Sequence, residues 1–192
     1  MASVSASETV ASATVTKILI DKGGIKLIKK GDKNYNMEFY LENPSINLSS
    51  LINNNLIKLI YDLNVDLFEH IEIEKINDYD SNIFILFKDL FNEMSLPHYY
   101  YYFNLKHNVE ENHFLISPQV SVIKNRMECV NLHHGRINYR AINEHLALFN
   151  IDAILPSGDS VIATMIEKII CNIIYKIFNR VKHFVSTINI KK

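Results

Sequence analysis

The chain has 192 residues, of which 48% are hydrophobic and 21% charged, so it is long and apolar enough to form a folded domain rather than a disordered segment. Its 20 basic and 21 acidic residues give a net charge of −1, which argues against a protein that wraps duplex nucleic acid by electrostatics alone. Ile (28 residues) and Asn (22 residues) are strongly over-represented, a bias that A/T-rich codons produce.

Residues 1–14 are small and polar, and we expect them to form a flexible or extended N-terminal arm. They lack the basic and apolar regions of a secretory signal, and no window of about 18 apolar residues predicts a membrane span. Cys129 and Cys171 do not have the spacing of a zinc site, and we interpret them as two thiols rather than a disulfide. These features predict an intracellular protein.

The first part of the globular region has the pattern of β-strands. Residues 15–20 and 25–29 predict a hairpin around a Gly-Gly turn, and residues 35–41 alternate apolar and polar side chains. Residues 49–64 fit neither the helical nor the strand period. Residues 65–76 alternate Leu and Ile with acidic side chains, which predicts a strand with one wet face.

Residues 82–95 predict the mid-chain helix. Ile83, Phe87, Leu90 and Met94 follow the helical period, the preceding turn ends in good N-cap residues, and Pro97 follows the helix. Beyond it, residues 98–106 alternate as a strand, and the chain up to 155 carries further short β-like segments.

A second, longer helix is expected over residues 157–190, after a Pro-Ser-Gly-Asp-Ser boundary. Its apolar stripe predicts a surface that packs on the domain or on a partner: Ile162, Ile166, Ile169, Ile173, Ile177 and Val181. Together with the β-rich domain of residues 15–156, this helix predicts an α+β fold, with a mostly antiparallel sheet or barrel.

The segment from Arg140 to His145 has an Arg-x4-His spacing that resembles the motif of the HEPN nucleases. That resemblance implies His145 as general acid and base and Arg140 as stabiliser of the phosphorane in RNA cleavage. The family is all-helical and this chain is rich in strands, so we favour an exposed strand or turn here and predict a non-enzymatic protein.

No metal or other cofactor is predicted. His133, His134, Glu144 and His145 are the residues closest to a metal-ligand set. His133 and His134 are neighbours, which point to opposite faces of a strand, and the HExxH spacing is absent. Exposed histidines are the favoured interpretation.

A tyrosine-rich strand offers an alternative function, the binding of single-stranded nucleic acid. Tyr100 and Tyr102 share a strand face with Lys106, so the rings could stack on bases and the ammonium could contact phosphate. The plainer interpretation is a strand with one aromatic face in the core, and the absence of a basic surplus favours it.

Residues 34–44, together with the Ile/Asn/Lys bias, resemble small structural proteins of nucleocytoplasmic large DNA viruses with A/T-rich genomes. The resemblance implies a virion component such as a minor capsid protein, located in the virion and the host cytoplasm. Our leading hypothesis is therefore a structural or interaction protein. Its arm and C-terminal helix would dock on other chains, either capsid proteins or a second copy of itself.

Overall fold

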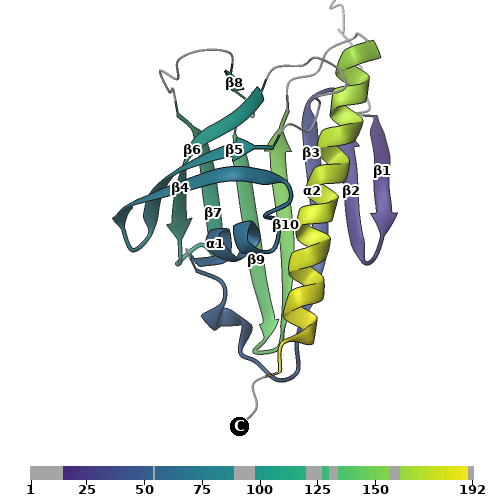
Figure 1. The fold of residues 1–192 in the computed structure, drawn as a ribbon. Coiled ribbons are helices and arrows are strands. Elements are labelled where there is room, and N and C mark those ends of the chain that lie inside the picture. The colour runs from purple at the N-terminus through teal and green to yellow at the C-terminus, as the bar shows by residue number, and fades with distance from the viewer. Residues whose placement is uncertain are drawn as a thin grey trace, which may run out of the picture.

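The computed structural model describes residues 15–53, 55–88, 98–119, 127–129, 134–155 and 161–189. The predicted arm at residues 1–14, His133, and the second half of the predicted mid-chain helix lie outside the described residues. The predicted α+β class is confirmed: an antiparallel sheet is combined with one short helix and one long C-terminal helix (Figure 1).

The chain forms ten described strands, with two short helices between the third and the fourth and one long helix after the last. The strands are β1 (Thr16–Lys22), β2 (Ile25–Lys30), β3 (Asn34–Glu42), β4 (Phe68–Asn77), β5 (Asp80–Phe87), β6 (His98–Asn108), β7 (His113–Pro118), β8 (Met127–Cys129), β9 (Gly135–Asn143) and β10 (Leu146–Ile154). The helices are the 3-10 turn η1 (Leu48–Ser50), α1 (Asn55–Asp62) and α2 (Val161–Thr187).

The sheet order is β1-β2-β3-β10-β9-β7-β6-β5-β4, and all these neighbours are antiparallel. The short β8 pairs with β6 in parallel. The pairing of β3 with β10 joins segments more than a hundred residues apart, so the last strand lies in the middle of the sheet. This leaves β1–β3 on one side of the sheet and β4–β7 on the other.

Strand β3 shows why this region forms a sheet. Tyr35, Met37, Phe39 and Leu41 are all buried and alternate with exposed or partly exposed residues. This period of two places all four on the face that packs against the helices. We call this the inner face of the sheet, and the opposite one the outer face.

The prediction of a helix over 82–95 is wrong for its described part, because residues Asp80–Phe87 form strand β5. Ile83 and Phe87 are four residues apart, a spacing that places two side chains on one face of a strand as well as of a helix. Strand pairing decides between the two, since Ile83 lies between Ile73 of β4 and Phe103 of β6. The short helix of the fold is α1, in the region whose pattern was ambiguous.

The long C-terminal helix is present as α2 and lies next to β2 and β3, with α1 against it (Figure 1). Its contact with the sheet is centred on Cys171, Phe178, Val181 and Val185, of which Phe178 packs at 5.3 Å, between ring centroids, from Phe39. The helix is therefore covered by its own sheet along this face.

This orientation corrects the predicted partner-binding stripe. Val181 is only 1% exposed and belongs to the core, so it cannot meet a partner. The other described members of the stripe are partly buried: Ile166, Ile169, Ile173 and Ile177. The side chain of Ile162 lies outside the described residues. The helix is apolar over two adjacent stripes, and the sequence pattern alone does not say which of them faces the sheet.

Candidate functional site

The inner face of the sheet is lined by apolar and aromatic side chains in register across the strands. Phe39, Phe149 and Tyr139 form one row over β3, β10 and β9, with the Phe39 and Phe149 rings stacked at 5.3 Å. On the far side, Ile83 and Phe103 of β5 and β6 continue this face and are buried. The result is a continuous apolar surface beneath the two helices.

The helices cover this surface unevenly. The long α2 contacts β2 and β3, where Ile25 and Leu27 are fully buried. On the β4 side the cover is the eight-residue α1, whose Leu56 is buried and whose Tyr61 ring stacks at 5.9 Å on Phe68. The two halves of the inner face therefore have covers of very different size.

Several inward-facing apolar residues remain partly exposed although they lie away from the sheet edges. Ile151 of β10 lies between Met37 and Ile137, which are 2% and 5% exposed, yet it keeps solvent-accessible surface itself. Tyr139 of β9 and Ile85 of β5 are partly exposed as well. Protein interiors are normally packed as densely as organic crystals, so inward-facing side chains at the centre of a sheet are usually fully covered. These three side chains pack against the core and still keep surface that solvent can reach, so apolar surface at the sheet centre stays accessible.

Two buried hydroxyls in the described residues have no hydrogen-bond partner. They belong to Ser81 of β5 and Tyr101 of β6, which are 2% and 8% exposed and both lie on the inner face. A buried polar group without a partner costs about 1–3 kcal/mol. Such a group is stabilised when a bound molecule or a water forms a hydrogen bond with it.

A third hydroxyl of the inner face is satisfied. The hydroxyl of Tyr139 lies 2.9 Å from Nε2 of His107, whose ring stacks at 4.1 Å on Phe114. Burial, followed by the nearby His113, lowers the pKa of His107, which favours the neutral imidazole. Burial also raises the pKa of Tyr139, so a neutral pair links β6 to β9.

A polar cluster lies at the end of the interior between β2, β3 and α2. The ammonium of Lys29 donates to both carboxylate oxygens of Glu167, at 3.0 and 3.1 Å, beside Tyr35. Burial opposes the charge on Lys29, but its hydrogen bonds to Glu167 and Tyr35 outweigh this and raise its pKa. Burial raises the pKa of Tyr35 to about 12 and that of the Cys171 thiol to about 11.

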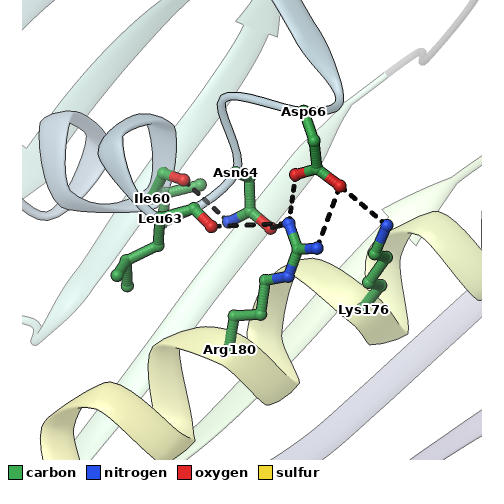
Figure 2. Close-up of polar contacts among 6 residues, drawn as sticks. All are labelled: Ile60, Leu63, Asn64, Asp66, Lys176 and Arg180. Atoms are coloured by element: carbon green, nitrogen blue, oxygen red, sulfur yellow. Dashed lines mark hydrogen bonds and ion pairs between the residues drawn. The ribbon is translucent and has the colours of Figure 1, made fainter.

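The turn between α1 and β4 is tied to α2 by a group of polar contacts (Figure 2). Arg180 donates to both carboxylate oxygens of Asp66 and, at 3.1 Å, to the amide oxygen of the buried Asn64. Lys176 donates to the same carboxylate at 2.9 Å. The hydrogen bonds from Arg180 and then Lys176 hold the pKa of Asp66 well below its usual range. We call Asp66, Lys176 and Arg180 the latch, because they fix α1 against α2.

The residues of the predicted nucleic-acid site lie on the outer face of β6. Tyr100 is only 7% exposed and stacks at 5.6 Å on Phe84, with Tyr102 tilted against the same ring. Lys106 is exposed. The buried ring of Tyr100 has a protein partner on its face, so it does not offer the open stacking platform that the prediction required.

The nuclease resemblance implied that Arg140 and His145 lie on a helix, and the structure places neither of them on one. Arg140 is an exposed residue of β9, and His145 lies in the turn between β9 and β10. Nδ1 of His145 lies 2.8 Å from the backbone oxygen of Ile46, which gives the ring a structural contact. Within the described ranges no three His, Cys, Asp or Glu side chains converge as a metal site.

An open groove of about 560 Å³ lies over the ends of β3, β10, β9 and β7, mainly on the outer face. Its polar groups bind one another. The amide of Asn36 donates to the oxygens of Asn150 and Asp152 at 2.8 and 2.7 Å, and Arg136 lies 3.0 Å from Nδ1 of His113. We therefore place the candidate site in the interior rather than in this groove.

No protein-family model matches the sequence, and neither does any curated protein. The fold itself is shared with solved structures. The lipid transfer and protein localization domain of human StarD13 superposes with a TM-score of 0.66 at 8% identity, covering 91% of each chain. Human STARD10 gives a TM-score of 0.60 at 6% identity, over 86% of this chain and 71% of that one. The chain therefore has the fold of these proteins.

An enzyme shares the fold less closely. Norcoclaurine synthase from Thalictrum flavum gives a TM-score of 0.50 at 11% identity, over 82% of this chain and 97% of that one. The fold is thus found in a lipid transfer domain and in an enzyme, and it does not by itself decide between binding and catalysis.

These comparisons overturn the viral hypothesis. The matching structures are not viral structural proteins, so both the resemblance inferred from residues 34–44 and the minor capsid role that it implied are wrong. They give no support to capsid partners or to the nucleic-acid alternative either. In the described ranges, neither helix combines the length and apolarity needed to span a bilayer.

The sequence interpretation missed the functional interest of the inner face. The sequence placed Tyr101 in a strand and Ser81 in a turn. Whether a polar atom has a hydrogen-bond partner can be recognised only when its neighbours in the fold are known. Ile151 carries no sequence signal at all. It is one Ile among 28, and only its packing distinguishes it.

Proposed function

We propose that this protein binds an apolar small molecule between the inner face of the sheet and its two helices. The observation that carries the proposal is the accessible apolar surface at the sheet centre, where Ile151 and Tyr139 face inward and are only partly buried. Ligand sites are typically concave and mostly apolar, with a few polar groups that fix orientation. The inner face offers such a surface, with the buried hydroxyl of Tyr101 on it.

The fold likeness supports the same class of ligand. One of the matching structures is a lipid transfer domain, and the likeness extends over 91% of this chain. Removing apolar surface from water yields roughly 25 cal/mol per Å². An alkyl or ring system that fills this interior would thus bind by burial, and a hydrogen bond from the inner face would orient its polar end.

We favour binding over catalysis because two potential nucleophiles of the interior, Cys171 and Lys29, are held in unreactive forms. Burial raises the pKa of the Cys171 thiol to about 11, and a thiol needs a lowered pKa to act as a nucleophile. Lys29 is kept charged by Glu167, whereas an amine must be neutral to attack a carbonyl. The interior is therefore better suited to hold a molecule than to transform it.

The test is a binding titration with a neutral naphthylamine dye, N-phenyl-1-naphthylamine, whose fluorescence rises in apolar surroundings. We expect saturable binding and displacement by 1-decanol. Ile151→Trp should fill the interior and weaken dye binding at least tenfold, while Ile154→Trp, on the exposed outer side of the same strand, should not.

Circular dichroism must show that both variants are folded, and Ile151→Phe provides a smaller change should the Trp variant unfold. Dye binding that does not saturate in the parent protein would contradict the proposal. So would equal binding by a folded Ile151 variant and the Ile154 control.

A further inference from the structure

We infer that the hydroxyl of Tyr101 hydrogen-bonds a neutral oxygen, a hydroxyl or carbonyl, on the buried end of the bound molecule. This inference rests on the proposed function and adds a class of ligand to it. The ligand would be a largely hydrocarbon alcohol, ketone or ester. It would not be a molecule that places a carboxylate or phosphate against the hydroxyl of Tyr101.

The position of Tyr101 carries the first step. It lies on the inner face of β6, opposite Ile85 of β5, and its ring stacks at 4.6 Å on that of Phe103. Its side chain is only 8% exposed, and its hydroxyl has no hydrogen-bond partner among the residues that the structure describes. A phenol can both donate and accept a hydrogen bond. The phenol can therefore form a hydrogen bond with either a hydroxyl or a carbonyl group of the ligand.

The surroundings of Tyr101 select against a charged group. Among the described residues, its neighbours are Ile85 across the strand, Phe103 along its own strand and the thiol of Cys129 in β8, and none of the three is cationic. Burying an ion without a counter-charge is far more costly than burying a hydroxyl that gains one hydrogen bond. Burial also raises the pKa of Tyr101 itself, which keeps the phenol neutral.

The charges that the structure places on the inner face lie elsewhere. Lys29 and Glu167 are paired with each other between β2 and α2. Lys75 of β4 lies opposite Ser81 of β5. Ser81 is four residues along β5 from Ile85, the residue opposite Tyr101, and this separation is about 13 Å at the usual rise per residue. An anionic group would be drawn towards the Ser81 end, so the two hydroxyls are not equivalent.

The experiment combines two variants with three ligands of equal chain length. The parent protein, Tyr101→Phe and Ser81→Ala are titrated with 1-decanol, decanoate and decane by displacement of the naphthylamine dye. We expect Tyr101→Phe to weaken 1-decanol binding about 3- to 10-fold, the usual range for one neutral hydrogen bond. Decane binding should not change, because it cannot form the bond.

Ser81→Ala is the matched control, since it removes the other hydroxyl that lacks a partner. It should leave 1-decanol binding unaltered. A separate readout is the thermal midpoint without ligand. Tyr101→Phe should not lower it, because the phenol hydroxyl forms no hydrogen bond with the described residues of the protein.

Each outcome decides the question. Equal weakening of decanol and decane would mean that the ring acts through shape alone, and would overturn the inference. Loss of decanol binding in Ser81→Ala but not in Tyr101→Phe would place the polar end at the other hydroxyl. Tighter binding of decanoate than of decanol by the parent protein would contradict the neutral class. If neither the dye nor any of the three ligands binds the parent protein, the proposed function itself fails.

Discussion

The two halves of the sheet are covered in different ways. On the side of β1–β3, the long α2 packs Phe178 on Phe39, and Ile25 beneath it has no exposed surface. On the side of β4–β7, the cover is the short α1 and the turn that follows it. Both hydroxyls that lack partners in the described residues, those of Ser81 and Tyr101, lie in this second half.

On the proposed function, this difference gives the two halves of the sheet different roles. A 27-residue helix supplies enough apolar side chains to fill the space above β2 and β3. An eight-residue helix does not fill the space above the other strands, and the residues between the halves remain partly exposed. The half under α2 would then stabilise the fold, and the ligand would lie over the sheet centre and the side covered by α1.

The largest effect should come from a cavity in the packed half. Phe39 contacts both Phe149 and Phe178, so Phe39→Ala should lower the free energy of unfolding by about 3–5 kcal/mol. Ile85→Ala in the other half removes a partly exposed side chain and should cost clearly less. Urea denaturation measures both values. Equal losses would show that the two halves are packed alike.

An intermediate effect is expected from the tyrosine hydroxyls. Tyr139→Phe removes the partner of His107 and should cost about 1–2 kcal/mol of stability, because a buried imidazole nitrogen then lacks its hydrogen bond. Tyr101→Phe removes a hydroxyl without a partner and should cost nothing. Thermal denaturation of the two variants under the same conditions compares them. The contrast fails if Tyr101→Phe is the more destabilising change.

The smallest effect concerns the latch, which joins the two halves. Asp66 is about half exposed, so Asp66→Asn should cost only about 0.5–1 kcal/mol despite its two cationic partners. Its folded pKa is lowered, so its contribution should be complete above the unfolded pKa of about 4 and decline as the pH falls below it.

Two measurements sharpen this last expectation. The difference in stability between parent and Asp66→Asn should shrink between pH 5 and pH 3, and it should also shrink at high salt. Asp66→Asn weakens the latch, so the dye should associate faster with this variant if α1 must move away from α2 for the ligand to enter. An unchanged rate would mean that the ligand enters without this movement.

The sequence alone determined the class of fold and much of the local structure. Alternating patterns predicted the β1–β2 hairpin, β3 and β6, and they placed Tyr101 and Phe103 on one face of β6 and Tyr100 and Tyr102 on the other. The apolar period predicted the long C-terminal helix. These signals are local, because the period of a strand or helix is set by backbone geometry within a few residues.

Tertiary structure decided the rest. Strand pairing turned residues 82–87 into part of β5, and the choice between two apolar stripes of α2 depended on which one met Phe39. Whether a hydroxyl has a partner, or an isoleucine a neighbour, depends on residues far away in the chain. Ile151 and Tyr101 therefore gained their significance only when the strands were brought together, since packing is a property of the whole sheet and its covers.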